Sequence, residues 1–267
     1  AQHRPAGSIK RYALAEGVIS SVILRGSGML QSEVLQNLYD DYYTDAVARK
    51  RAIAAVQSVD HLEALARGNL GSVVDVGSGE GAVLQEIDRR GLATSIDAVE
   101  ISASGIERIS SRHLPSLRSV QSFDGYAIPF PDRSFDTAIA IHVLEHVEHE
   151  RLFLREMARV ARKVYIEVPL EHTIRLQRSI EAGRPYGHIN HYTQARFLNL
   201  LETSGLDVQN SQVFSNSLPY EQFLAGKTKG SIKHAIRSGL LSAAPALAPK
   251  LMVYLGAALC VSRSAAI

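Results

Sequence analysis

The stretch VVDVGSGEG, residues 73–81, determines the fold class of this chain. It is an apolar run that ends in an acid and continues into three glycines at alternate positions. A short apolar strand followed at once by closely spaced glycines brings backbone N–H groups and a helix N-terminus close to a small ligand. The candidate ligands are a dinucleotide, a nucleotide phosphate or another adenosine compound.

The sequence around this stretch alternates between two patterns. Short apolar runs rich in β-branched residues alternate with segments of helical periodicity. The strand-like runs are SVVDV, SIDAVE, LRSVQS, FDTAIAI and KVYIEV, and the clearest helical segments are residues 80–90, 103–112 and 148–161. This alternation predicts βαβ units and a parallel sheet that binds its ligand at the carboxyl edge.

The flanking segments differ from this core. Residues 8–68 have a helical pattern that ends near Gly68, so we expect an N-terminal helical cap over residues 1–68 and an α/β domain over residues 69–267. A loop rich in His, Gly and Pro, residues 169–192, leads to a helix that begins after Thr193, an expected N-cap. Two strand-like runs, LDVQNSQVF and YLGAALCVS, follow. The segment between them, residues 216–252, far exceeds the usual connection of about 4 to 6 residues, which predicts a folded insertion or substrate lid.

Composition limits the class of partner and compartment. The chain has 267 residues, 46% hydrophobic and 21% charged, with a formal net charge of +2, so we expect a globular protein that does not bind nucleic acid. A single cysteine, Cys260, fits a reducing compartment, and the N-terminus has no apolar core of signal-peptide length, so we expect a cytoplasmic protein. Pro245, Pro249 and Lys250 interrupt the apolar residues 240–260 and argue against a membrane-spanning helix.

The glycine spacing alone does not identify the ligand. Gly77, Gly79 and Gly81 are spaced GxGxG, whereas the dinucleotide fingerprint is GxGxxG, and no lysine follows as a phosphate loop requires. A tight strand-to-helix turn without a ligand also fits these glycines. The next strand-like run ends in Glu100, whose carboxylate can accept hydrogen bonds from the two hydroxyls of a ribose. NAD and adenosyl cofactors would both use such an acid.

A longer segment distinguishes between these cofactors. FDGYAIPFPDRSFDTAIAIHVLEHV, residues 123–147, together with VVDVGSGEG and AVE, resembles the class I S-adenosylmethionine-dependent methyltransferases, in particular their small-molecule branch. The resemblance covers roughly residues 70–215. It implies a doubly wound, Rossmann-like, seven-stranded, mostly parallel sheet, S-adenosylmethionine as cofactor, and methyl transfer, most favourably to an oxygen of a small-molecule or glycan acceptor.

The resemblance also assigns residues to the cofactor. Asp75 and the three glycines would hold its methionine end, Glu100 the ribose, Asp124 and Gly125 the adenine, and Ile141 and His142 would lie beside the sulfonium. Tyr126 departs from the family, since many members carry a smaller acid there. Tyr43, in YDDYYTD, resembles a tyrosine that reaches the cofactor carboxylate, with aromatic packing of the cap helix as the alternative.

The pentapeptide HVLEH, residues 142–146, also matches the H-x-x-E-H pattern of zinc peptidases. In that pattern two histidines one helical turn apart bind the metal and the glutamate acts as a base. Here the pentapeptide follows a buried strand within the methyltransferase pattern. We therefore expect helix-end packing and cofactor contact at these residues, and no metal site.

Six of the ten histidines fall between positions 142 and 191. Methyl transfer to oxygen needs a group that takes the hydroxyl proton, and histidine suits this role near neutral pH. The candidates for the general base are His188 and His191, followed by His142 and then His172. The alternative is that Asn190 and His191 fix the loop or cap the next helix.

Several alternatives stay open at this stage. Lys227, Lys229, Lys233 and Arg237 precede an apolar run from Leu240, so the insertion could contact a membrane surface, although a solvated helix with a packing helix is favoured. The other functional classes are an NAD-dependent oxidoreductase, a zinc hydrolase built on His142, Glu145 and His146, and a non-catalytic adenosyl-binding protein. The acceptor, the methylated atom and the oligomeric state stay open.

Overall fold

A computed structural model describes residues 45–183 and 187–263. Its centre is a seven-stranded sheet of order β3-β2-β1-β4-β5-β7-β6, in which β7 alone runs antiparallel to its neighbours. The strands are β1 (Ser72–Val76), β2 (Ser95–Glu100), β3 (Leu117–Ser122), β4 (Phe135–Ile141), β5 (Ala161–Leu170), β6 (Leu206–Phe214) and β7 (Tyr254–Ser262). The predicted doubly wound, Rossmann-like sheet is confirmed.

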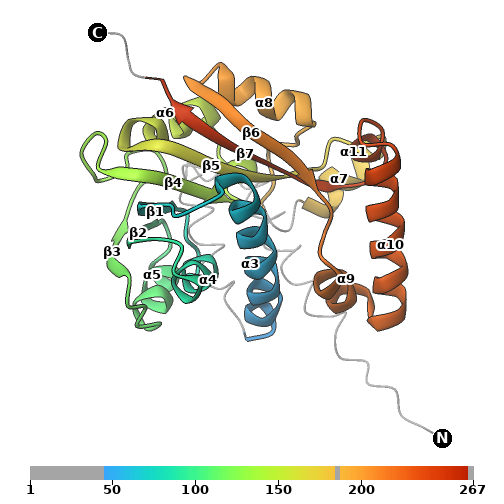
Figure 1. Cartoon of the computed structure of the whole chain (residues 1–267), viewed down its shortest axis with the longest axis horizontal. Coiled ribbons are helices and arrows are strands. Elements are labelled where there is room, and N and C mark those ends of the chain that lie inside the picture. Colours follow the sequence, from blue (N-terminus) through green and yellow to red (C-terminus); the bar gives the residue numbers. More distant parts are fainter. Residues whose placement is uncertain (1–44, 184–186, 264–267) are drawn as a thin grey trace, which may run out of the picture.

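Helices cover both faces of the sheet. They are α3 (Asp45–Ala66), α4 (Ala82–Arg90), α5 (Ala103–Ser110), the 3₁₀ turn η1 (Leu144–His146), α6 (Glu150–Val160), α7 (Leu176–Gly183), α8 (Gln194–Glu202), α9 (Leu218–Ala225), α10 (Lys227–Ala243) and α11 (Ala248–Leu251). In Figure 1, α6 and α8 lie above the sheet and α3, α4 and α5 lie below it. The predicted helix over residues 8–68 is observed as α3 from Asp45 onward, and its earlier part lies outside the described residues.

Two hydrophobic cores form because successive strand residues point to opposite faces. Val74, with Phe153 of α6 and Phe197 of α8, belongs to one core, whereas Val73, with Leu62 of α3, belongs to the other. All five side chains are at most 1% exposed. Parallel strands buried on both faces read as continuous apolar runs, which explains the pattern of SVVDV and FDTAIAI.

The glycine-rich turn links β1 to α4. Gly77, Gly79 and Gly81 all have positive φ, at 79°, 58° and 81°, a conformation that glycine adopts without strain. A Cβ at Gly77 would lie 2.8 Å from the Val143 side chain, so this turn packs directly against the segment that follows β4. The carboxyl ends of β1, β2, β4 and β5 therefore form one edge, at which the predicted site residues lie.

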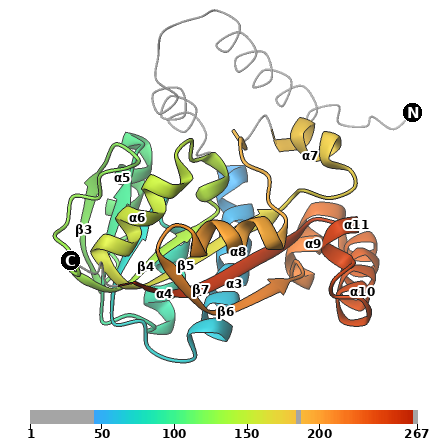
Figure 2. The same cartoon turned by 90° about the horizontal axis from the view of Figure 1, so that it is seen from above.

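The three helices α9, α10 and α11 fill the connection between β6 and β7. Figures 1 and 2 show them grouped at one end of the molecule, away from β3 and α5. They lie within the predicted insertion, residues 216–252, whose role as a lid stays a prediction. Among the described residues, no helix combines the length and the apolar character that crossing a membrane would need.

Candidate active site

Glu100 is fixed against the glycine-rich turn. Its Oε2 accepts a hydrogen bond from the backbone N–H of Gly79 at 2.8 Å, and its Oε1 accepts bonds from the backbone N–H and the hydroxyl of Ser102 at 3.0 and 2.7 Å. The residue is only 4% exposed. The sequence predicted an acid at this place, and the structure adds that its carboxylate is oriented before any ligand binds.

Asp75 is a buried carboxylate at the end of β1, in the strand next to that of Glu100. Burial raises the pKa of Asp75 to about 7, Ser78 opposes this shift through a hydrogen bond, and the charge of Glu100 adds to it. Burial disfavours the charged form of an acid unless a cation or a donor compensates. A cationic ligand at this turn would therefore stabilise both carboxylates.

Asp124 lies in a turn after β3. Its Oδ1 accepts hydrogen bonds from the backbone N–H groups of Tyr126 and Ala127 at 2.8 and 2.7 Å, and these bonds lower the pKa of Asp124. Gly125 has a φ of 93°. The Tyr126 hydroxyl accepts a bond from the His149 backbone N–H at 3.2 Å, so Tyr126 joins this turn to the start of α6. Tyr43 lies outside the described residues.

His142 directly follows Ile141, the last residue of β4, and contacts two buried acids. Its Nδ1 lies 3.3 Å from Glu145 Oε1 and its Nε2 lies 3.4 Å from Glu167 Oε1. Burial alone would lower the pKa of His142, but the bonds to Glu145 and Glu167 raise it to about 10. At neutral pH this raised pKa favours the imidazolium form of His142. Its role as a general base stays a prediction.

Glu167 is the main residue that sequence reasoning missed. Besides His142, it accepts hydrogen bonds from Ser58 Oγ at 2.7 Å and Tyr165 Oη at 3.0 Å, and its Oε2 lies 2.9 Å from His61 Nδ1. Burial would raise the pKa of Glu167, but the bonds to His142 and His61 lower it to about 2. The only sequence signal was an acid inside the apolar run KVYIEV.

Two other predicted histidines share one acid, Glu171. His188 Nδ1 lies 2.8 Å from Glu171 Oε2, and His191 Nε2 lies 3.8 Å from the same oxygen. Burial lowers the pKa of His191. Burial would also lower the pKa of His188, but the bond to Glu171 and the charges of Glu145 and Glu171 together raise it. His172 is exposed. His191 is thus the candidate base that is neutral near pH 7.

The predicted alternative for Asn190 is observed. Asn190 Nδ2 donates to the carbonyl oxygens of Leu144 and Val147 at 3.2 and 2.7 Å, and the backbone N–H groups of Ile189 and Asn190 donate to the Glu145 carbonyl oxygen. Thr193 caps α8, as expected, by accepting a bond from the Arg196 N–H at 3.1 Å. The loop before α8 is therefore attached to η1.

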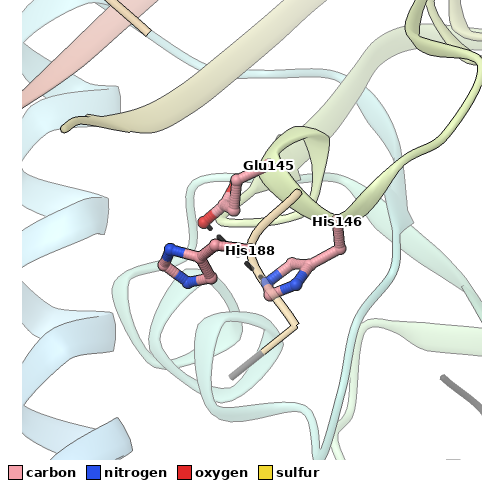
Figure 3. Close-up of side chains that lie close together, drawn as sticks. All are labelled: Glu145, His146 and His188. Atoms are coloured by element: carbon pink, nitrogen blue, oxygen red, sulfur yellow. Dashed lines mark ion pairs between the residues drawn. The ribbon is translucent and has the colours of Figure 1, made fainter. Parts of the chain in front are cut away.

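The HVLEH pentapeptide does not form one helix. His142 has a φ of 57°, and Leu144–His146 form a 3₁₀ turn, so His142 and His146 are not paired across one α-helical turn. The geometry of the zinc peptidases is therefore not formed. Instead, Glu145 and His146 lie beside His188 from the later loop, as Figure 3 shows.

Comparison with known proteins identifies the family. A family model described as "Methyltransferase domain" matches residues 47–211, which is more than half of the chain. The chain belongs to the methyltransferase-domain family. The match extends from α3 into β6 and includes every predicted site residue except Tyr43.

Relatives of this methyltransferase domain include two N-methyltransferases. The chain is 33% identical over 94 residues to a phosphatidylethanolamine N-methyltransferase of Cereibacter sphaeroides, covering 35% of this chain and 46% of the relative. It is 33% identical over 110 residues to ajmaline N-methyltransferase of Rauvolfia serpentina, covering 39% of this chain and 37% of the relative. The chain thus spans less than half the length of these curated relatives.

The fold of the domain is shared with solved methyltransferase structures. Geranyl diphosphate C-methyltransferase of Streptomyces coelicolor, solved with Mg²⁺, geranyl diphosphate and S-adenosyl-L-homocysteine, superposes with a TM-score of 0.62 at 12% identity, covering 88% of this chain and 99% of that one. Together with the family match, this confirms the predicted membership of the class I S-adenosylmethionine-dependent methyltransferases.

Proposed function

We propose that the protein transfers a methyl group from S-adenosylmethionine to an oxygen atom of a small-molecule or glycan acceptor. The observation that carries this proposal is the pair of buried carboxylates, Asp75 and Glu100, at the glycine-rich turn. S-adenosylmethionine is cationic and carries no phosphate, so it suits carboxylates and carbonyls and not a phosphate-binding nest.

Each cofactor contact would come from a defined part of the edge. Asp75 and the backbone around Gly77, Gly79 and Gly81 would bind the methionine end, and Glu100 would accept hydrogen bonds from the ribose hydroxyls. Asp124 and Gly125 would contact the adenine, and Ile141 would lie beside the sulfonium. The protonated His142 side chain would repel the sulfonium, so it would keep its contacts with Glu145 and Glu167. When bound, S-adenosylmethionine supplies an electrophilic methyl group whose leaving group is a neutral thioether.

The acceptor side would come from the loop between β5 and α8. This loop ends over the carboxyl edge, where binding residues of α/β proteins gather. His191 would take the proton from the acceptor hydroxyl as its oxygen attacks the methyl carbon, since its imidazole is neutral near pH 7. Much of the rate enhancement would come from holding the acceptor in line with the methyl group.

The names of the relatives support a small acceptor, because they include an alkaloid, a phospholipid and an isoprenoid diphosphate. Their methylated atoms are nitrogen and carbon, so an acceptor nitrogen is the competing assignment. Adding hydroxyl and amine acceptors and following release of S-adenosylhomocysteine decides between these two atoms. Absence of release with every acceptor, despite binding of the cofactor, would favour a non-catalytic adenosyl-binding protein.

Titration calorimetry of the full chain with S-adenosylmethionine, S-adenosylhomocysteine and NAD tests the cofactor first. We expect binding of the two adenosyl compounds and not of NAD. Glu100→Gln should weaken binding about 10- to 100-fold, because hydrogen bonds to charged groups contribute about 1.5–3 kcal/mol each. Glu107→Gln is the matched control, since Glu107 is exposed on α5. Binding of NAD alone would refute the proposal.

A further inference from the structure

Three side chains at the acceptor side of the edge have the composition of a metal site. Glu145 and His146 come from η1 and His188 from the loop before α8, and one potential ligand atom of each lies within 4.8 Å of the others. Figure 3 shows the three side chains facing one another. Because they come from two segments, the spacing of HVLEH alone could not indicate this set.

Both imidazoles are held through Nδ1. His146 Nδ1 lies 3.1 Å from the carbonyl oxygen of Gly187, and His188 Nδ1 lies 2.8 Å from Glu171 Oε2. Metal-binding histidines commonly donate from one ring nitrogen to a carbonyl or carboxylate, which orients the ring. The two contacts match this arrangement.

The carboxylate of Glu145 is the third feature. Glu145 is 1% exposed, and its Oε2 is buried without a hydrogen-bond partner among the described residues, whereas Oε1 lies 3.3 Å from His142 Nδ1 and 4.0 Å from His146 Nε2. Leaving a buried acceptor unsatisfied is costly, more so for a charged group. A cation bound at Oε2 would remove this cost.

We propose that Glu145, His146 and His188 bind one divalent transition-metal ion, with Glu171 as a positioning residue for His188. Two imidazoles and one carboxylate suit Zn²⁺, Fe²⁺ or Co²⁺, whereas Mg²⁺ and Ca²⁺ prefer oxygen ligands. Three protein ligands leave a position for an oxygen ligand. If the proposed function holds, that ligand is the acceptor oxygen, whose pKa the ion would lower.

The direct test is titration of the chelator-treated full chain with Co²⁺, followed by visible absorption, with Zn²⁺ as competitor and Mg²⁺ as comparison. We expect one equivalent of Co²⁺ with d–d bands that Zn²⁺ abolishes and Mg²⁺ does not. His146→Ala and His188→Ala should each weaken Co²⁺ binding at least tenfold. Glu171→Gln should weaken it about 10- to 100-fold with the stoichiometry kept.

The controls separate loss of the site from loss of the fold. His113→Asn removes an exposed histidine with a φ of 51°, a conformation that asparagine tolerates, and should leave Co²⁺ binding unchanged. Each variant should keep the wild-type affinity for S-adenosylmethionine. The metal site would be overturned if the wild-type protein bound this cofactor but not Co²⁺. It would also be overturned if both alanine variants still bound Co²⁺. Co²⁺ binding without cofactor binding would instead refute the proposed function.

A separate surface lies on the insertion. Ile232 and Ile236 of α10 are 56% and 57% exposed and lie one helical turn apart, with Lys229 on the same stripe. Phe223 and Leu224 of α9 are also exposed, at 39% and 47%. A helix face of this kind is normally buried against another apolar surface.

The exposed charged side chains that follow α9 in the insertion are all lysines. No Asp or Glu follows Glu221 in the sequence, whereas Lys227, Lys229 and Lys250 are exposed on the insertion. Exposed apolar side chains flanked by lysines are typical of helices that lie in a membrane interface, where lysines near an anionic surface strengthen binding. We infer that the surface formed by α9 and α10 docks on an anionic phospholipid bilayer.

Flotation of the full chain with phosphatidylglycerol-containing vesicles, compared with pure phosphatidylcholine vesicles, tests this inference. We expect binding to the anionic vesicles at low salt and its loss at high salt. The double variant Ile232→Ser, Ile236→Ser should reduce binding at least fivefold, whereas Ile174→Ser, which removes an isoleucine that is 72% exposed outside the insertion, should not. Absence of binding at low salt would overturn the inference. A lipid-free dimer that the double variant converts to monomer would overturn it in favour of a second copy of the chain.

Discussion

Asp75 shows at the scale of one residue how burial prepares a ligand contact. Its pKa near 7 means that the carboxyl is increasingly protonated as the pH falls below 7. A cationic ligand binds the carboxylate form, so the affinity for S-adenosylmethionine should fall by up to tenfold per pH unit below 7. Asp75→Asn should weaken binding about 10- to 100-fold at pH 8 and abolish this pH dependence, as measured by calorimetry between pH 6 and 8. Asp132→Asn, at an exposed acid, is the control.

The same substitution has the opposite effect on stability. The raised pKa means that the buried negative charge of Asp75 destabilises the folded state. This effect grows as the pH rises from the ordinary pKa of an aspartate toward 7. The ligand-free Asp75→Asn variant should therefore have a higher Tm than the wild type at pH 8, with the difference vanishing near pH 4. Equal Tm values for the wild type and the variant at both pH 4 and pH 8 would show that neighbouring groups already stabilise the charged carboxylate of Asp75.

His191 gives a second prediction at this scale. At saturating S-adenosylmethionine and acceptor, His191→Ala should lower kcat about 10²- to 10⁴-fold and leave cofactor affinity unchanged. The wild-type rate should rise with pH through an apparent pKa below 6.5, since burial lowers the pKa of His191, and the variant should lack this limb. His113→Asn, at an exposed histidine outside this loop, is the control. Unchanged turnover would remove His191 from the mechanism.

Residues whose roles follow from local sequence could be predicted, and those that depend on distant partners could not. Glu100 and Thr193 are recognisable because an acid at a strand end and a hydroxyl before a helix act on neighbouring backbone. Glu167 is different, because its partner Ser58 is 109 positions away. His142, His188 and His191 likewise have different environments, set by acids that spacing alone does not reveal.

At the scale of elements, the strands could be predicted from their sequence pattern. All strands except β5 match the predicted runs residue for residue. The buried β1, β2, β4 and β7 read as apolar runs, and β3 and β6, which are only partly buried, match equally well. β5 is longer than the predicted run KVYIEV at both ends. Ala161 pairs with Phe135 of β4, and Pro169 and Leu170 pair with β7, so strand pairing extends β5 beyond the apolar run. The insertion was recognisable from its length, but its division into three helices depends on packing.

Two glycines of α10 test that packing. A Cβ at Gly230 would lie 2.4 Å from the Glu221 carbonyl oxygen in α9, whereas nothing lies within 4 Å of a Cβ at Gly239. Gly230→Ala should therefore destabilise the fold by about 1–3 kcal/mol, because backbone cannot move aside cheaply. Gly239→Ala should stabilise it by up to about 1 kcal/mol through helix propensity. Urea unfolding measures both, and equal effects would mean that α9 and α10 do not pack this closely.

For the whole molecule, Glu167 connects segments that are far apart in the sequence. It joins α3, through Ser58 and His61, to the ends of β4 and β5, through His142 and Tyr165. Helix α3 and the carboxyl edge of the sheet are thereby held together by one buried carboxylate. Loss of charge at this group should therefore affect global stability and not only the site.

This connection has a defined pH range, which His142→Gln makes measurable. The pKa of His142 is raised to about 10. Its contribution to the stability of the folded state is therefore full below pH 6.5 and is lost as the pH rises through 10. The pKa of Glu167 is lowered to about 2. Its contribution to the stability of the folded state is therefore full above pH 4.5 and is lost as the pH falls through 2. The variant should have a Tm about 2–8 °C lower than the wild type between pH 4.5 and 6.5. This decrease is modest because the His142 side chain is 36% exposed, so that solvent screens its ion pair with Glu167. The Tm difference should shrink steadily toward pH 10, and a difference that is constant from pH 6 to 10 would show that His142 contributes packing and not charge.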